Sequence, residues 1–231
     1  MSISVIIPTC NESLRIKQLV NHLTEHGGDL LKEIIVVDAA ATDDDTLGQV
    51  PKSKAIAIKS EATCRAIQMN QGAVSAQGDI LYFVHADVIP PANFPRDIYA
   101  SLAKGYDFGF FSYNFDSPKL LLKVNSYFTR FPNIFTGGGD QTFYIPRSVF
   151  QEQGGFDEEV VMMEDFDFFY KLKKAGLRYE IINNPVLVSA RKYKKNSYLK
   201  VNLVNLITMI LFRSGYRLDH LKRFYNKALN G

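Results

Sequence analysis

A histidine and an aspartate two residues apart, His85 and Asp87, are the pair in this sequence best placed to do chemistry. They follow an apolar run, residues 80–84, which predicts a strand buried on both faces, as in parallel sheets covered by helices. Ligands of such sheets bind at the carboxyl ends of the strands. Residues two apart on an extended chain point the same way, so both side chains can face one ion. The alternative is an aspartate that caps the turn before Pro90 and Pro91.

Two further groups of acids stand where elements begin or end. Asp38 ends a second predicted strand, residues 33–38, and an acid after a strand often accepts hydrogen bonds from ribose hydroxyls. The alternative is an aspartate that starts a turn. Glu164, Asp165 and Asp167 open a predicted helix, where the helix dipole alone would favour acids.

The elements that must position these residues alternate in type. In the first half we expect strands at 2–7, 33–38, 54–59 and 80–84, and helices between residue 16 and Gly27 and at 64–76. Asn11 is a candidate cap for the first helix. This β-α-β rhythm predicts an α/β fold with a doubly wound, mostly parallel sheet flanked by helices.

The second half predicts a mixture of strands, helices and one loop. We expect strands at 108–115, 142–145, 178–183 and 186–190, helices at 92–103, 119–129, 164–175, 197–212 and 219–229, and a helical turn at 148–153. Three consecutive glycines predict a flexible loop at 137–141. The domain division that we expect is 1–190 for the α/β domain and 191–231 for a basic helical extension.

Composition narrows the setting. The chain has 231 residues, of which 46% are hydrophobic, enough for one sizeable core. Its two cysteines give no disulfide framework and fit a reducing, cytoplasmic setting. The first residues resemble a strand rather than a secretory signal. The longest apolar run, residues 203–212, is too short to span a bilayer.

The charge is unevenly distributed along the chain. From residue 171 onward there are 14 Lys and Arg against 2 acids, and before it 13 against 22. A basic region of this kind favours an anionic partner: phosphate, nucleic acid or a membrane surface. We expect no nucleic acid, and contact with the inner face of a membrane through helix 197–212. The alternative is that this helix packs on the sheet and the charges are solvated.

Seven motifs in one order resemble glycosyltransferase family 2, the nucleotide-sugar transferases with the fold called GT-A. They are residues 4–12 (SVIIPTCNE), 35–38 (IVVD), Arg65 with 69–73 (MNQGA), 78–81 (GDIL), 85–87 (HAD), 154–156 (GGF) and 163–165 (MED). The HAD form, the GDQ at 139–141 and the SAR at 189–191 resemble one bacterial branch of that family.

The resemblance implies a role for each motif. Asp38 would accept hydrogen bonds from the uracil or ribose of the donor. Asp87 would bind Mn²⁺ or Mg²⁺ bridging the two phosphates, with His85 in place of the first acid of the family's D-x-D and Ala86 between them. His85 could instead bind a sugar hydroxyl or the phosphate. Asp165 would be the general base. The remaining expected donor-site residues are Pro8, Thr9, Asn11, Glu12, Arg65, Asn70, Asp140, Gln141 and Arg191.

The expected activity is transfer of a sugar, with inversion, from a nucleoside-diphosphate donor, which we expect to be UDP-linked, to an unknown acceptor that is lipid-linked or a glycan. Two alternatives remain open. One is a nucleotidyltransferase, although residues 8–12 lack the glycine-rich phosphate loop that such enzymes favour. The other is a nucleotide-sugar-binding protein that has lost catalysis. The altered D-x-D and the alanines at 39–41 favour this alternative.

Overall fold

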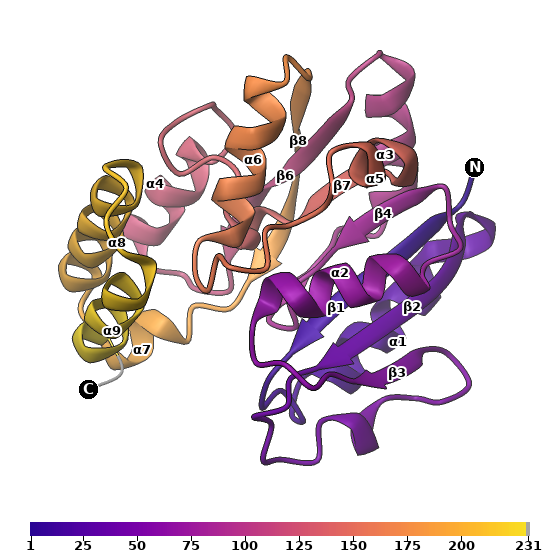
Figure 1. Ribbon diagram of the computed structural model, residues 1–231, viewed down its shortest axis with the longest axis horizontal. Coiled ribbons are helices and arrows are strands. Elements are labelled where there is room, and N and C mark those ends of the chain that lie inside the picture. The colour runs from indigo at the N-terminus through magenta and orange to yellow at the C-terminus, as the bar shows by residue number, and fades with distance from the viewer. Residues whose placement is uncertain (230–231) are drawn as a thin grey trace.

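The structure is a computed structural model that describes residues 1–229. This part of the chain folds around one mixed sheet of eight strands in the order β3-β2-β1-β4-β7-β6-β8-β5. Figure 1 labels every strand of the sheet except β5. The strands are β1 (Ile3–Thr9), β2 (Leu31–Asp38), β3 (Ile56–Lys59), β4 (Ile80–Phe83), β5 (Val88–Ile89), β6 (Phe108–Phe115), β7 (Phe143–Pro146) and β8 (Tyr179–Val188).

The N-terminal half has the predicted parallel arrangement. Strand β1 pairs in parallel with β2 and β4, and β2 with β3. Every residue of β1 and β4 is buried, which explains why both read as continuous apolar runs. Strand β7 then pairs antiparallel with both β4 and β6, and β6 is parallel to β8. The prediction of a mostly parallel α/β sheet is confirmed.

Two details of the far side of the sheet differ from the prediction. The two strands expected at 178–183 and 186–190 form one strand, β8, whose register on β6 shifts between Phe111 and Tyr113. Between these two positions β8 has more residues than β6, and Pro185, which has no N–H to donate, is one of them. The sequence therefore predicts a break between two strands where the structure has a bulge in one strand. The short strand β5 was not predicted; it adds antiparallel to β8 at the sheet edge.

Helices cover both faces of the sheet. The core on one face includes side chains of α1 (Ile16–Gly27) and α3 (Phe94–Ala103). The core on the other face includes side chains of α2 (Arg65–Ser75), α5 (Arg147–Glu152) and α6 (Glu164–Lys174). Three short 3-10 helices, η1 (Gly28–Leu30), η2 (Leu47–Gln49) and η3 (Gly139–Gln141), lie in the connections.

A separate group of helices lies at one end of the sheet, at the left of Figure 1. It contains α4 (Leu120–Phe128), α7 (Lys192–Lys195), α8 (Tyr198–Arg213) and α9 (Leu218–Leu229), which share a small core of their own. Helix α4, which comes from the middle of the chain, also belongs to this group. The domain boundary expected at residue 190 stays a prediction. Within residues 1–229, no helix is both long and apolar enough to cross a bilayer.

Candidate functional site

The candidate site begins where three neighbouring parallel strands end. Thr9, the last residue of β1, is the register partner of Asp38, the last residue of β2. Ile6 of β1 is opposite Phe83 of β4, so His85 and the residues after it leave the sheet at the same edge. The topology therefore brings the expected nucleotide residues and the H-x-D pair together.

Asp38 is buried and both of its carboxylate oxygens have partners. Oδ1 accepts hydrogen bonds from the hydroxyls of Thr9 and Thr42, each at 2.8 Å. Oδ2 pairs with Nζ of Lys59 at 2.9 Å, a lysine that the sequence analysis did not single out. The carboxylate is thus fixed in orientation at the carboxyl edge, and its contact with a nucleoside stays a prediction.

The loop after β1 is fastened to the polar turn after β2. Asn11 adopts a left-handed backbone with φ 58°, and its Oδ1 accepts hydrogen bonds from the backbone N–H groups of Asp43 and Asp44. The expectation that Asn11 caps the first helix is wrong, because α1 starts only at Ile16 and carries no side-chain cap. Pro8 is buried within β1.

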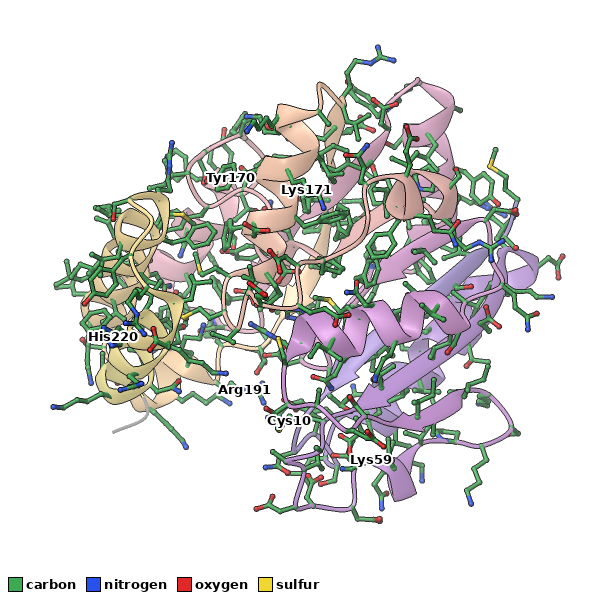
Figure 2. All side chains as sticks on the ribbon, in the orientation of Figure 1. Cys10, Lys59, Tyr170, Lys171, Arg191 and His220 are labelled. Carbon is green, nitrogen blue, oxygen red and sulfur yellow. The ribbon has the colours of Figure 1, made fainter. Side chains whose placement is uncertain are left out.

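Arg191 joins this loop to the H-x-D motif. Its guanidinium lies 2.8 Å from Oε1 of Glu12 and 3.1 Å from Oδ2 of Asp87. Glu12 also pairs with Arg15 at 2.9 Å. Partial burial lowers the pKa of Arg191, but the hydrogen bonds that it donates to Glu12 and the charge of Asp87 outweigh this effect, so the pKa is raised. Figure 2 shows Arg191 directed toward the loop that carries Cys10.

A histidine and a buried carboxylate face each other beside the H-x-D motif. Nε2 of His85 lies 3.7 Å from Oδ2 of Asp165, too far for a hydrogen bond, and this nitrogen is buried without a hydrogen-bond partner. Burial raises the pKa of the Asp165 carboxyl from 3.8 to about 6, and the charge of His85 opposes the rise. Asp165 thus holds its proton far more readily than an exposed aspartate.

Glycine at position 139 is what permits this approach. A Cβ there would clash with the His85 ring and lie 2.7 Å from Oδ2 of Asp165. Gly137 and Gly138 are equally constrained, against Phe169 and Phe166. The segment predicted as a flexible loop is therefore closely packed, and its glycines serve close approach.

The side chain of Gln141 is buried inside the same loop. Its Oε1 accepts from the N–H of Gly137 at 2.9 Å, and its Nε2 donates to the carbonyl of Thr129 at 3.2 Å. Asp140, next to it, contributes its negative charge to the surroundings of Arg65 and Asp165. Contact of Asp140 and Gln141 with a donor or acceptor stays a prediction.

Arg65 and Asn70, both on α2, have partners on other elements. Nε of Arg65 lies 2.7 Å from Oε1 of Glu164, which is buried, and the charge of Glu164 is the main reason that the pKa of Arg65 is raised. Asn70 exchanges hydrogen bonds with the backbone of Phe156, at 2.9 and 3.1 Å, and so holds the Gly-Gly-Phe segment against α2. The pairing of Glu164 with Arg65 was not predicted from the sequence, where the place of Glu164 directly before Asp165 was the available signal.

The residues at the edge fit a divalent cation only together with a substrate. Among residues 1–229, no three His, Cys, Asp or Glu side chains gather closely enough to hold a metal ion. His85 nevertheless offers a buried nitrogen with no hydrogen-bond partner, and Asp87 offers a carboxylate at the end of the β4 segment. Two protein ligands suit an ion that takes its other ligands from substrate phosphates.

Comparison with solved structures shows the same fold in several glycosyltransferases. The S. aureus TarS 1–349 structure in complex with UDP-GlcNAc has a TM-score of 0.63 at 20% identity, covering 100% of this chain and 72% of that one. The Pyrobaculum calidifontis mannosyltransferase PcManGT, in complex with GDP-Man and Mn²⁺, has a TM-score of 0.66 at 18% identity, covering 99% and 72%.

A third structure is glucosyl-3-phosphoglycerate synthase from Mycobacterium tuberculosis with Mn²⁺, UDP and glucosyl-3-phosphoglycerate. Its TM-score is 0.63 at 17% identity, and the match covers 94% of this chain and 81% of that one. A search of curated proteins found no significant match. The sequence profile described as glycosyl transferase family 2 matches residues 4–157. That stretch contains most of the strands, both residues of the H-x-D pair and more than half of the chain, and so the protein belongs to glycosyl transferase family 2.

Proposed function

We propose that this protein transfers a sugar from a nucleoside-diphosphate donor, UDP-linked by preference, to an acceptor hydroxyl with inversion at the anomeric carbon. The observation that carries the proposal is the buried Asp165 carboxylate, 3.7 Å from the unpartnered nitrogen of His85 and next to the edge where Asp38 and Asp87 lie. Several of the matching structures were solved with UDP, UDP-GlcNAc or GDP-Man, which supports a donor of this class.

In this proposal the nucleoside lies along the ends of β1 and β2. Asp38 accepts hydrogen bonds from base or ribose, and the loop of Asn11 and Glu12 forms the lip of the pocket. The diphosphate faces Arg191, the cation that now bridges Glu12 and Asp87. A planar guanidinium with several donors is well suited to phosphate oxygens.

Asp87 and His85 would hold the divalent cation. When bound, the ion offsets the charge that develops on the leaving diphosphate. An imidazole ligand favours Mn²⁺ over Mg²⁺. The Mn²⁺ in three of the matching structures supports the same choice.

Asp165 acts as the base. As the acceptor oxygen attacks the anomeric carbon, its proton passes to Asp165, the bond from that carbon to the diphosphate oxygen breaks, and the nucleoside diphosphate leaves. One displacement on the face opposite the leaving group inverts the configuration. A base works best when its pKa lies near the working pH, and burial moves the pKa of Asp165 in that direction.

A nucleotide-sugar-binding protein without catalysis is the second candidate, because Arg191 already neutralises the carboxylate that a metal would use. Membership of the family favours sugar transfer over nucleotide transfer.

A melting-temperature screen with nucleotides and nucleotide sugars, with and without Mn²⁺, identifies the donor first. Turnover is then followed as release of the nucleoside diphosphate, with Glu164→Gln as the matched control for Asp165→Asn. We expect Asp165→Asn to keep donor affinity near wild type and to lose about 10²- to 10⁴-fold in rate. Glu164→Gln should lose less, because consecutive helix residues point in different directions. Donor binding without turnover in the wild type would support the binding protein, and unchanged turnover in Asp165→Asn would remove Asp165 as the base.

A further inference from the structure

One face of α8 is apolar and uncovered. Leu199, Leu203, Leu206 and Ile210 recur at helical spacing and are 77, 58, 38 and 57% exposed. The opposite face is buried through Val201, Val204, Thr208 and Met209. The helix thus packs on the molecule with one side and presents a leucine-rich stripe with the other.

Helix α4 carries a second uncovered stripe. Its large exposed residues are Leu120, Leu121, Val124, Tyr127 and Phe128. The stripe continues into the next segment, where Phe131, Ile134 and Phe135 are 49, 40 and 41% exposed, and the rings of Tyr127 and Phe131 lie 5.6 Å apart. The inward face of α4 is buried through Leu122 and Ser126.

The two helices run in the same direction. Leu122 near the start of α4 and Val201 near the start of α8 lie in one cluster with Tyr193. At the other end, Phe212 of α8 stacks on Tyr170 of α6, and the chain that follows α4 passes over α6 at Gly137.

Both stripes therefore face the same side. The helices touch through Asn125 and Asn202, whose amides lie 3.4 Å apart. Going around the axis of α4 in chain order, Asn125 lies about a quarter turn after the stripe. Going around the axis of α8 in the same way, Asn202 lies about a quarter turn before the stripe. Because the two helices are parallel and meet through these asparagines, the opposite offsets turn both stripes to the same side, where they form one surface, which we call the α4–α8 surface. Monomeric proteins rarely leave so many adjoining apolar side chains uncovered unless the surface binds something.

The two segments that carry this surface contain charges of one sign. Residues 117–135 contain three Lys and Arg, residues 194–213 contain four, and neither stretch contains an acid. Arg191 and Arg217, on either side, are not counted, because they pair with Glu12 and Asp87 and with Asp219. A second copy of the chain would bring basic residues against basic residues, which disfavours self-association through this surface. Apolar side chains surrounded by basic ones are what an anionic lipid surface binds.

We infer that the α4–α8 surface docks the protein on an anionic lipid bilayer. The inference goes beyond the proposed function and does not depend on it. The segment after α4 also leads from this surface to the candidate site: Thr129 accepts from Gln141, and Gly139 packs against His85. If the proposed sugar transfer holds, docking would hold the site beside the membrane, where a lipid-linked hydroxyl is the acceptor within reach.

Sedimentation of the full chain with lipid vesicles tests the docking without any enzyme assay. Vesicles of phosphatidylcholine alone are compared with vesicles that contain about one third phosphatidylglycerol. We expect binding to the anionic vesicles and little to the neutral ones. Binding should weaken between about 0.1 M and 1 M salt, as the Debye length falls from about 10 to 3 Å.

Two variants distinguish docking through the α4–α8 surface from non-specific adsorption to vesicles. Leu199→Gln with Leu203→Gln should weaken partitioning at least about tenfold, because two side chains that enter the lipid interface become polar. Val74→Gln is the matched control, since Val74 is 87% exposed on α2, away from the α4–α8 surface. All three positions are exposed, so unchanged thermal melting should show that each variant folds.

Three outcomes would overturn the inference: no binding to either vesicle, equal binding to both, or an equal loss in Val74→Gln. A wild-type dimer that the double variant converts to a monomer, together with no vesicle binding, would mean that a second copy covers the surface.

Discussion

Replacing Asp165 by Asn should stabilise the ligand-free, metal-free protein, and should do so increasingly as the pH rises. The carboxyl is 9% exposed, and burial raises its pKa from 3.8 to about 6. An acid whose pKa is higher in the folded than in the unfolded chain binds more protons when folded. The free energy of unfolding therefore falls as the pH rises from 3.8 to about 6, and above about pH 6 this loss of stability is complete.

The size of the effect follows from the two pKa values. Since each pH unit between them costs about 1.4 kcal/mol, the ionised carboxylate destabilises the folded protein by about 3 kcal/mol at pH 8, and by well under 1 kcal/mol at pH 4. Asparagine keeps the shape and removes the charge. The advantage of Asp165→Asn over wild type should grow by about 2 kcal/mol between these pH values, or about 4–8 °C in melting temperature for a chain of this size.

Thermal melts of wild type and variant at pH 4, 6 and 8, with a chelator present, measure this difference. The control is Asp43→Asn, which removes an exposed carboxylate away from Asp165. A difference between Asp165→Asn and wild type that did not change with pH would refute the reasoning, because burial would then not be raising the pKa. A growing difference combined with lost turnover would mark Asp165 as a group kept at a cost to stability for its chemistry.

Three further predictions concern the same edge of the sheet. Asp87→Asn should abolish the Mn²⁺-dependent part of UDP affinity and His85→Ala should reduce it less, as measured by calorimetry with and without Mn²⁺; unchanged metal-dependent affinity in Asp87→Asn would remove it as a ligand. Arg191→Ala should lower metal-free UDP affinity about tenfold and make binding more dependent on Mn²⁺, because the guanidinium is then missing from Asp87; equal losses with and without the ion would show that the arginine acts only on the fold. Gly139→Ala should destabilise the protein by about 1–3 kcal/mol in denaturant melts, because its methyl group has to displace His85 or Asp165; a neutral effect would mean that the loop is loose.

The parts of the fold that the sequence predicted correctly are those with local signals. Residues 80–84 form an apolar run longer than any half-exposed strand would carry, and they became part of the fully buried centre of the sheet. The H-x-D pair directly follows that run, so predicting its place at the carboxyl edge of the sheet required only the prediction that the strands are parallel. The bulge in β8 gave the opposite signal, because Asn183, Asn184 and Pro185 are typical of a break.

The contacts inside the candidate site were beyond the sequence because they join distant residues. Arg191 and Glu12 are separated by 179 positions, and nothing near either residue indicates the other. The three glycines at 137–139 have the composition of a flexible tether, whereas their meaning comes from the phenylalanines and the His85–Asp165 pair packed against them. Composition describes what a backbone is free to do, and only packing shows why that freedom was needed.

Helix α8 shows where the sequence left a choice that the structure decides. Its apolar residues surround most of the helix, so the sequence allows either burial in the fold or docking on something apolar. The structure does both: Val201 and Met209 are in the core, and the stripe through Leu203 is uncovered. Helix α4 has the same division, although its sequence gave no reason to single it out. Each uncovered face alone would be an ordinary surface feature. Side by side on segments whose charged residues are all basic, they are the reason for the proposed docking, because an anionic bilayer would match both their apolar character and their charge.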